Sequence, residues 1–407
     1  MRATASAGSE AAHLQVRGPF DQHTAGEDAM TLAAFGSVEE LLLKKTTDTP
    51  VFCFYPKALR AAARCFVEGF PGQVLYAVKA NPSPHVVRWI VEGGVREFDT
   101  ASIREIVLVR GILEDARCSF NHPVKHRNAI VAAHRDWGIR DFVVDHMAEL
   151  DKLLEVVGSD IVVQVRVATP NPHARLSFNS KFGATPGEAV ALLRALAQRG
   201  AAAAVSTHLG YQTTDPGAFG KGLQLVAQVV EAAGIQPAYV NVGGGFPSVL
   251  LPKGSSLKDY FHVIGATHAG ESSISAAPLK CEPGSALAHP GGGVLTQVLL
   301  VKENSIYIND GIYGALAELI HSKIQPPTRV LMRDGTERTG MLRHYTVFGP
   351  TCDSYDTIPV PFELPAALRE GDWLQLGMMG AYSSALITDF NGLGVHEFAV
   401  IGDYSRP

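Results

Sequence analysis

Strand-like runs alternate with helical patterns along most of this chain, and this alternation constrains the fold more than any other feature. The runs are rich in β-branched and aromatic residues, and the stretches between them are rich in Ala and Leu. The expected strands are VFCFY at 51–55, QVLYAV at 73–78, REFDT at 96–100, DFVVD at 141–145, IVVQVRVA at 161–168, AAVSTHL at 203–209, AYVNVGG at 238–244 and LKCEPGS at 279–285. The expected helices cover 57–69, 83–93, 101–111, 147–157, 186–199 and 216–233.

These repeated strand–helix units occupy residues 51–284 and predict an α/β domain that folds as a (β/α)8 TIM barrel. A doubly wound sheet is the alternative. It is less favoured because no GxGxxG follows the first strand.

The pattern changes after about residue 285, where strand-like runs follow one another without long helices. The runs are GGVLTQVLLVKENSIYI at 292–308, TRVLMR at 328–333, RHYTVFG at 343–349, DWLQLG at 372–377 and HEFAVIGD at 396–403. Short strands separated by Gly- and Pro-containing turns predict an all-β C-terminal domain, a β-sandwich or a β-barrel, over residues 285–407. Residues 1–30 are expected to be a tail, with Met30 as an alternative start.

Composition excludes several classes of protein. A chain of 407 residues with 46% hydrophobic residues is expected to form two domains. A net charge of −5 gives no reason to expect a nucleic-acid partner, and no apolar run is long enough to span a membrane. The first thirty residues lack the apolar segment of a secretory signal. The five cysteines lack metal-site spacing, so we expect no metal site and reduced thiols in a cytoplasmic protein: Cys53, Cys65, Cys118, Cys281 and Cys352.

Lys79, in YAVKANP at 76–82, ends an apolar strand of the expected barrel. Most lysines extend to solvent, but barrel enzymes keep their catalytic groups at the carboxyl ends of the strands. Burial there would lower the pKa of Lys79 and favour Schiff-base formation.

Three further motifs follow strands. NVGGGFP at 241–247 contains three successive glycines, which allow backbone N–H groups to approach a phosphate, although such turns are common. Glu282, in CEPGS, could pair with the pyridine nitrogen of pyridoxal phosphate (PLP). His208, in THLGYQTTD, could stack on that ring, although a lone histidine is more often structural.

The chain then becomes recognisable. Its motifs resemble, in order, those of ornithine decarboxylase, a PLP-dependent decarboxylase of the alanine-racemase-like fold (fold type III). The motifs cover about residues 50–395: YAVKANP, EFDTASIREI, RLSFNSKFGA, HLGYQ, VNVGGGFP, CEPG, INDGIYG, FGPTCDSYD and MGAYSSALITDFNG.

The resemblance implies a role for each matching residue. Lys79 would carry PLP, Glu282 would pair with the ring nitrogen, and His208 would stack on the ring. Gly243, Gly244 and Gly245 would hold the phosphate, together with Tyr382, while Asp99 and Arg166 would support the lysine and the ring. Cys352 would return a proton after CO2 leaves, and Asp353 and Tyr313 would bind the substrate.

The resemblance also implies an obligate homodimer with shared active sites, because Cys352 and Asp353 reach the partner's site in this family. Residues 31–50 would join the β-domain. A cytoplasmic enzyme of polyamine biosynthesis is the expected setting.

Three departures from the family pattern limit the prediction. The arginine of EPGR is Ser285 and the serine after HxG is Tyr211, so both phosphate contacts are altered, although each hydroxyl can still donate a hydrogen bond. Ser322, beside His321, occupies the position of the acid that binds the distal ammonium of ornithine in this family. Lys323 either favours a substrate with a polar or anionic end or points to solvent while Glu318 or Asp356 replaces the missing acid.

The leading prediction is therefore decarboxylation of ornithine or lysine. A non-standard or acidic amino acid is an alternative substrate. Racemase activity is disfavoured by the GPTCD motif, and an inert regulatory relative is disfavoured by the retained Lys79, Glu282, His208 and Cys352.

Overall fold

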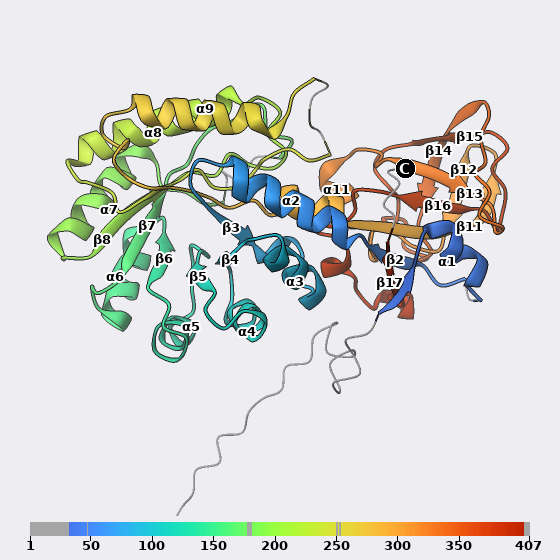
Figure 1. Ribbon diagram of the computed structural model, residues 1–407, viewed down its shortest axis with the longest axis horizontal. Coiled ribbons are helices and arrows are strands. Elements are labelled where there is room, and N and C mark those ends of the chain that lie inside the picture. Colours follow the sequence, from blue (N-terminus) through green and yellow to red (C-terminus); the bar gives the residue numbers. More distant parts are fainter. Residues whose placement is uncertain (1–31, 47, 177–180, 250, 252–253, 403–407) are drawn as a thin grey trace, which may run out of the picture. The chain divides into compact units, whose positions relative to one another are not determined.

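The computed structural model describes residues 32–46, 48–176, 181–249, 251 and 254–402. The expected tail at 1–30 lies outside these residues. From Ala33 onward the chain forms one unit that contains a parallel barrel and a second, mixed β-sheet (Figure 1).

In the described part of the chain, eight parallel strands close into a barrel in the order β10-β3-β4-β5-β6-β7-β8-β9. They are β3 (Gln73–Ala77), β4 (Glu97–Thr100), β5 (Arg117–Phe120), β6 (Asp141–Val144), β7 (Val162–Arg166), β8 (Ala202–Ser206), β9 (Val240–Asn241) and β10 (Leu279–Cys281). β10 pairs with both β9 and β3 and so closes the ring. Strands covered on both faces need apolar residues throughout, which explains runs such as VLYA and FVV. The predicted (β/α)8 barrel is confirmed.

Helices surround these strands (Figure 1). They are α2 (Pro56–Gly69), α3 (Pro84–Glu92), α4 (Ile103–Ile112), α5 (Arg127–Val131), α6 (Met147–Val157), α7 (Pro186–Gln198), α8 (Gly217–Ala233), α9 (Leu257–Gly270) and the short α10 (Ser285–Ala288). Local sequence sets their ends. α7 begins with a capping box between Thr185 and Glu188, and α8 ends at Gly234, whose φ of 70° suits glycine.

One strand was assigned to the wrong sheet from the sequence, and one barrel strand was missed. VFCFY at 51–55 was expected to begin the barrel, but β2 (Val51–Phe54) pairs with β11 and β17 in the second sheet. Its four residues are all buried, and a fully apolar run looks the same in either kind of sheet. The missing barrel strand is β5, whose short RCSF run begins with an exposed arginine and gives a weak strand signal.

The second sheet has nine strands within the described ranges, in the order β1-β17-β2-β11-β12-β14-β15, with β16 joined to β11 and β13 to β16. Its other elements are β1 (Ala33–Phe35), β11 (Gly292–Lys302), β12 (Ser305–Ile308), β13 (Thr328–Leu331), β14 (Leu342–Phe348), β15 (Phe362–Pro365), β16 (Trp373–Leu376) and β17 (Glu397–Ile401), with helices α1 (Val38–Lys44) and α11 (Leu319–Ser322). β1 pairs with β17, so the two ends of the described chain lie side by side (Figure 1). The predicted all-β second domain is confirmed.

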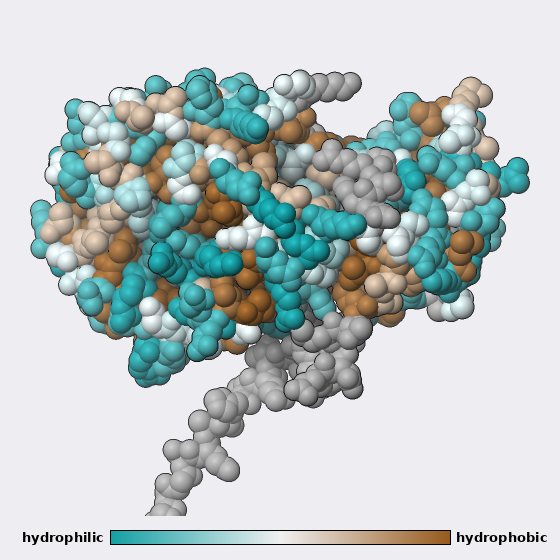
Figure 2. All heavy atoms as spheres, viewed as in Figure 1, coloured by the Kyte–Doolittle hydropathy of each residue, from teal (hydrophilic) through white to brown (hydrophobic). Residues whose placement is uncertain are grey.

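Helix α1 covers one face of this sheet. Leu41 and Leu42 pack with Trp373 and Leu295 in a buried cluster. On the face shown in Figure 2, hydrophilic side chains dominate and hydrophobic groups reach the surface in separate places. None of the helices in the described ranges is long and apolar enough to cross a membrane.

Hydrogen bonds join the sheet domain to the barrel beside Lys79. The side-chain amide of Asn81 donates to the carbonyl oxygen of Gly380 over 2.8 Å. The backbone N–H of Tyr382 donates to the carbonyl oxygen of Ala80, also over 2.8 Å. The end of β3 is therefore fixed by both domains.

Candidate active site

Lys79 lies in a short 3₁₀ turn, Val78–Ala80, directly after β3. Its Nζ is 3.5 Å from Oδ2 of Asp99, which is buried near the end of the neighbouring strand β4. The register pairs Ala77 with Asp99, so adjacent parallel strands bring the two side chains to one edge of the barrel. This is the carboxyl end of the strands, as predicted.

The ionisation of Lys79 differs from the prediction. The charge of Asp99 raises the pKa of Lys79, and this effect outweighs burial, which acts in the opposite direction. The side chain is also 46% exposed, so burial is a weaker influence than the apolar strand suggested. Lys79 is therefore an ammonium paired with Asp99.

Glu282 follows β10 and is held by two amides. The Nδ2 atoms of Asn121 and Asn241 donate to the same oxygen, Oε1, over 2.7 and 2.6 Å. Burial raises the pKa of Glu282, and the charge of Asp99 raises it further, while Lys79 and the amide of Asn241 lower it. Since both amides bond Oε1, Oε2 is left to meet another donor.

His208 and Arg166 complete the strand-end group. Arg166 is the last residue of β7, and its guanidinium carbon lies 5.6 Å from the ring centre of Phe182. His208 follows β8, and its Nδ1 accepts a hydrogen bond from the N–H of Gly210 over 3.2 Å. Burial lowers the pKa of His208 well below its ordinary value, so its ring is neutral at pH 7.

The three positions after β9 require glycine because backbone carbonyl oxygens of neighbouring loops lie too close for a Cβ atom. A Cβ at Gly243 would lie 2.2 Å from the carbonyl oxygen of Thr207. At Gly244 it would lie 2.8 Å from the carbonyl oxygen of Glu282, and at Gly245 2.6 Å from that of Gly210. The loop therefore presents backbone with no side chain, and it packs against the loops after β8 and β10. Such a surface fits a phosphate group.

The two altered phosphate positions lie on these same loops. Ser285 is buried at the start of α10. Tyr211 is also buried, but its hydroxyl donates to Oε1 of Glu318, so it is not free to donate elsewhere as the sequence suggested. The ring of Tyr382, from the second domain, lies 6.4 Å from the ring of Tyr211.

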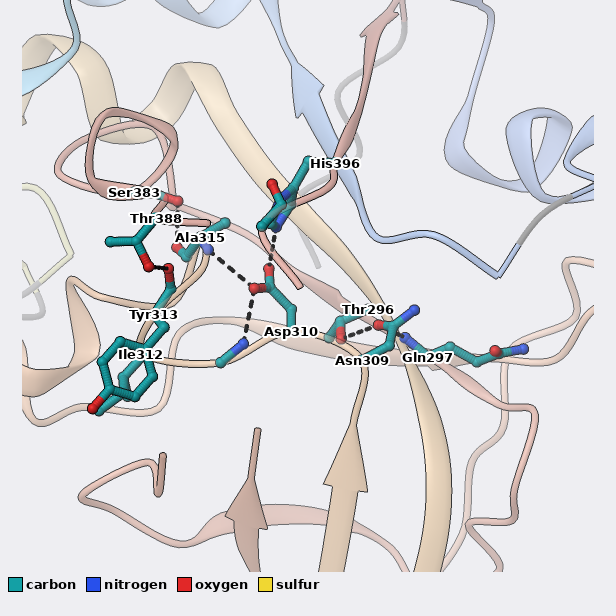
Figure 3. A network of polar contacts seen from close by, with 12 residues as sticks. Thr296, Gln297, Asn309, Asp310, Ile312, Tyr313, Ala315, Ser383, Thr388 and His396 are labelled. Carbon is teal, nitrogen blue, oxygen red and sulfur yellow. Dashed lines mark hydrogen bonds and ion pairs between the residues drawn. The ribbon is translucent and has the colours of Figure 1, made fainter. Parts of the chain in front are cut away.

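The second domain carries a separate polar group around Asp310 (Figure 3). Oδ2 of Asp310 lies 3.0 Å from Nε2 of His396, and both side chains are buried. Oδ1 of Asp310 accepts hydrogen bonds from the N–H groups of Gly311 and Ala315. Burial lowers the pKa of His396, but the hydrogen bond and charge of Asp310 outweigh this and raise it. The pair fixes the INDGIYG loop.

Tyr313, on that loop, contacts the candidate substrate acid. Its hydroxyl donates to Oδ2 of Asp353 over 2.6 Å, and this bond lowers the pKa of Asp353. Cys352 is exposed, and its Sγ accepts a hydrogen bond from Nδ2 of Asn391 over 3.4 Å. In the described residues, no contact joins Cys352 or Asp353 to the strand-end group around Lys79.

Neither replacement considered for the missing acid is available. Asp356 accepts hydrogen bonds from the N–H groups of Ile312 and Thr351, so it holds the loop together. Glu318 accepts a hydrogen bond from the hydroxyl of Tyr211.

The surroundings of Ser322 are instead polar and cationic. Its Oγ is buried without a hydrogen-bond partner among the described residues. The guanidinium of Arg175 is held by the carbonyl oxygens of Ser322 and Lys323 over 2.7 and 2.9 Å. His321 and Lys323 are exposed, and residues 177–180 of the RLSFNSKFGA motif lie outside the described ranges.

Sequence reasoning missed Asn121, Asn241 and the Asp310–His396 pair. Asn121 follows the unrecognised strand β5, and Asn241 stands in a motif read only for its glycines. A polar residue at the end of each barrel strand was the available signal. The pairing of Asp310 with His396 had no local signal, because the two residues meet only through the fold.

Comparison with known proteins decides the family. Residues 56–289 match the family described as pyridoxal-dependent decarboxylase, pyridoxal binding domain. The chain belongs to the pyridoxal-dependent decarboxylases. The decarboxylase flvG of Aspergillus flavus is 32% identical over 343 residues, covering 78% of this chain and 77% of that protein.

Two lysine/ornithine decarboxylases are also similar to this decarboxylase. The protein of Selenomonas ruminantium is 29% identical, covering 78% of this chain and 81% of that one. The crystal structure of the Vibrio vulnificus protein complexed with cadaverine has a TM-score of 0.74 at 28% identity, covering 91% of this chain and all of the other.

This decarboxylase is thus a PLP-dependent carboxy-lyase that acts on an amino acid. Its residues fit the cofactor. The glycine loop places no side chain at the strand ends, Glu282 has an oxygen available for a ring N–H, and Lys79 lies at the strand ends beside Asp99.

Proposed function

We propose that this decarboxylase acts on a diamino acid of the ornithine or lysine type and holds its cofactor through Lys79. The strand-end group, in which Lys79 pairs with Asp99 while Glu282 is oriented by two amides, supports the cofactor role most directly, and similarity to lysine/ornithine decarboxylases supports the substrate class. When bound, PLP supplies an electron sink for the carbanion that remains after CO2 leaves.

Each residue has a proposed task. Lys79 binds the cofactor covalently and releases it to the substrate amine, with Asp99 orienting the lysine. Glu282 holds a proton on the ring nitrogen through Oε2, and neutral His208 covers one face of the ring. The glycine loop, Tyr382 and Ser285 hold the phosphate, and Arg166 supports the ring.

Cys352 is proposed to protonate the substrate carbon in the partner's active site, beside Asp353. The exposure of Cys352 and the partial exposure of Asp353 support a role across an interface. Large apolar side chains of the same domain are also exposed, including Phe390 at 42%, Leu393 at 44% and Tyr355 at 80%. Exposed apolar groups of this kind are typical of interfaces, so we propose a homodimer with shared sites.

The proposed setting is the cytoplasm, in polyamine biosynthesis. Formation of a diamine from ornithine or lysine supports the pathway. The five cysteines form no disulfide in the described structure, which is consistent with a reducing compartment.

The cofactor role is tested by absorbance. Purified wild-type protein with PLP should show the visible band of lysine-bound PLP, and Lys79→Ala should lose it. Lys57→Ala, on the surface of α2, is the matched control and should retain the band. A band that persists in Lys79→Ala would refute the proposed attachment site.

A second candidate substrate has a neutral or anionic distal end. It is favoured by Ser322, which replaces an acid, and by Arg175 and Lys323 beside it. In this case a distal ammonium would have Asp353 as a partner but would also meet like charge. The two candidates differ in the charge that the pocket prefers.

Release of CO2 from ornithine, lysine, arginine, diaminopimelate and acidic amino acids separates them. The proposal expects the highest kcat/KM for ornithine or lysine. Ser322→Asp should then raise kcat/KM for these substrates by about tenfold or more, because a charged hydrogen bond contributes about 1.5–3 kcal/mol. Ser322→Asn is the uncharged control. A preference for acidic amino acids would replace the first candidate with the second.

A further inference from the structure

A buried polar cluster adjoins the glycine loop and has no role in the proposed reaction. We call it the Tyr211 cluster; its members are Tyr211, Gln212, Ser248, His289 and Glu318. All except Ser248 are at most 7% exposed. They come from the loops after β8 and β9, from the 3₁₀ helix His289–Gly291 that follows α10, and from the segment before α11.

Direct contacts place this cluster at the phosphate side of the barrel. The N–H of Thr213 donates to the carbonyl oxygen of Gly245 over 2.8 Å, so the loop that carries Tyr211 packs on the glycine loop. Ser248 lies three residues beyond that loop. β9 and β10 are the last two strands of the barrel, and barrels commonly hold phosphate on the loops after those strands.

The hydrogen bonds within the cluster form a chain. Tyr211 donates to Oε1 of Glu318, and Nε2 of His289 lies 3.4 Å from the same hydroxyl and 3.8 Å from Oε1. Nδ1 of His289 lies 2.7 Å from Oγ of Ser248. Gln212, which bonds Ser248, has a φ of 50°, an uncommon backbone conformation for a residue other than glycine.

The charges of the cluster do not suit a phosphate when Glu318 is ionised. In the part of the chain that the structure describes, none of the side-chain hydrogen bonds of Tyr211, His289 or Glu318 comes from an arginine or lysine side chain. Burial lowers the pKa of His289 to about 3, so it is neutral, and a carboxylate beside a phosphate would be repelled in a poorly solvated site. A proton on Glu318 removes that repulsion.

We propose that Glu318 takes up a proton when the phosphate group of the cofactor binds, and that this proton frees the Tyr211 hydroxyl to donate to the phosphate. With Glu318 ionised, the Tyr211 O–H bonds the carboxylate. With Glu318 protonated, the carboxylic acid can donate to the Tyr211 oxygen, and the Tyr211 hydrogen turns to the phosphate. Neutral donors would then replace the missing arginine.

The titratable groups around Glu318 allow it to take up a proton. They are Tyr211, His289 and Tyr382. The backbone N–H of Arg175 donates to the carbonyl oxygen of Tyr211, and its guanidinium is held by the carbonyl oxygens of Ser322 and Lys323. Burial raises the pKa of Glu318 to about 7, while the hydrogen bond from Tyr211 lowers it, so proton uptake near neutral pH is accessible.

This inference rests on the proposed use of Lys79, so the test separates the two. The dissociation constants of PLP and of pyridoxal, which lacks the phosphate, are measured from pH 6 to 9 with the full-length apoprotein. Both ligands use Lys79, so the ratio of the pyridoxal constant to the PLP constant isolates the phosphate. The wild-type ratio should fall about tenfold per pH unit above pH 7, as uptake of one proton requires.

Glu318→Gln cannot ionise and mimics the protonated acid, so its ratio should stay constant within about threefold above pH 7. Tyr211→Phe should weaken PLP binding about tenfold at pH 6.5 and leave pyridoxal binding unchanged, because it removes a donor to a charged group. The isosteric change in each variant preserves packing, and PLP binding by Glu318→Gln shows that it is folded.

Equal pH slopes in the wild type and Glu318→Gln would overturn the inference, as would a wild-type ratio that does not change with pH. An increase in KM for lysine in Glu318→Gln, with PLP affinity unchanged at every pH, would also overturn it and assign Glu318 to the substrate. If the wild type shows no visible band with PLP, the proposed function itself fails. If the band is present and the slopes are equal, this inference alone fails.

Discussion

At the residue scale, the charged side chains of the candidate site are held by specific partners. Asp99 is committed to Lys79, and two amides converge on one oxygen of Glu282. Asn121 and Asn241 thus decide which carboxylate oxygen of Glu282 is available. Orientation of an acid by neutral donors is a preorganised arrangement, and it preserves the acid's charge for another group.

Glu282→Gln tests this arrangement. The variant keeps an oxygen for both amides but loses the negative charge at the ring nitrogen, so kcat should fall about 10²–10³-fold while the visible PLP band remains. In Asn121→Ala, which keeps the charge of Glu282, kcat should fall about tenfold. Stopped-flow and steady-state kinetics measure both. A Glu282→Gln enzyme with wild-type kcat would contradict the role of the charge.

The Asp310–His396 pair gives a pH-dependent stability. The folded-state pKa of His396 is raised above the unfolded value, so the stabilisation is complete below the unfolded value of about 6.5 and is lost as pH rises through the folded value. Asp310→Asn keeps an oxygen for the N–H groups of Gly311 and Ala315 but removes the charge. It should lower the free energy of unfolding by about 1–3 kcal/mol at pH 6 and by less at pH 8.

Urea unfolding of both proteins at pH 6 and 8 measures this difference. The difference between the two proteins removes the contribution of other titrating groups. A destabilisation by Asp310→Asn that is the same at both pH values would show that the charge of His396 is irrelevant to stability.

At the element scale, loops at the ends of parallel strands bring the site together. β8, β9 and β10 are neighbours in the barrel, so the loops that follow them pack on one another. Gly243 illustrates how tightly they pack, because its Cβ position is occupied by the carbonyl oxygen of Thr207. Its backbone is also left-handed, with a φ of 70°.

Gly243→Ala and Gly234→Ala form a matched pair, since both glycines have a φ of 70° but only Gly243 is crowded. Gly234→Ala should cost about 1–2 kcal/mol of unfolding free energy from the left-handed backbone alone. Gly243→Ala should cost more and should also weaken PLP binding. Thermal unfolding and PLP titration measure the two effects. Equal losses of unfolding free energy and of PLP affinity in the two variants would mean that the close approach of Gly243 to Thr207 affects neither stability nor cofactor binding.

The elements also show where sequence reasoning succeeded. Lys79, His208 and Glu282, after β3, β8 and β10, were singled out from the position of a polar residue after an apolar run, which is a local property. Asp99 and Arg166, on β4 and β7, were named only through the resemblance to ornithine decarboxylase. The wrong placement of β2 in the barrel and the omission of β5 had a different cause. Apolar run length does not record which sheet a strand joins, and pairing partners are decided by the whole chain.

At the scale of the whole molecule, the proposed homodimer makes the site incomplete in one chain. Cys352 is exposed, and no contact in the described residues joins it to the group around Lys79. Both are nevertheless proposed to act in one reaction. Two inactive variants should therefore complement each other. Lys79→Ala mixed with Cys352→Ala should recover up to about a quarter of wild-type activity, because half the dimers are mixed and each has one complete site.

Activity after the two variants are co-refolded measures this recovery, with each variant refolded alone as the control. A mixture no more active than its components would argue against shared sites.

The sequence by itself determined the barrel, the all-β second domain and the positions of Lys79, Glu282, His208 and the glycine loop after barrel strands. These follow from local periodicity and from residues placed at strand ends. Tertiary structure alone decided which strands close the barrel, which way Lys79 ionises and where Tyr211 directs its hydroxyl. The pKa of Lys79 depends on Asp99, twenty residues away, and Tyr211 meets Glu318 from another domain. Such effects depend on distances in space, which a linear pattern does not contain.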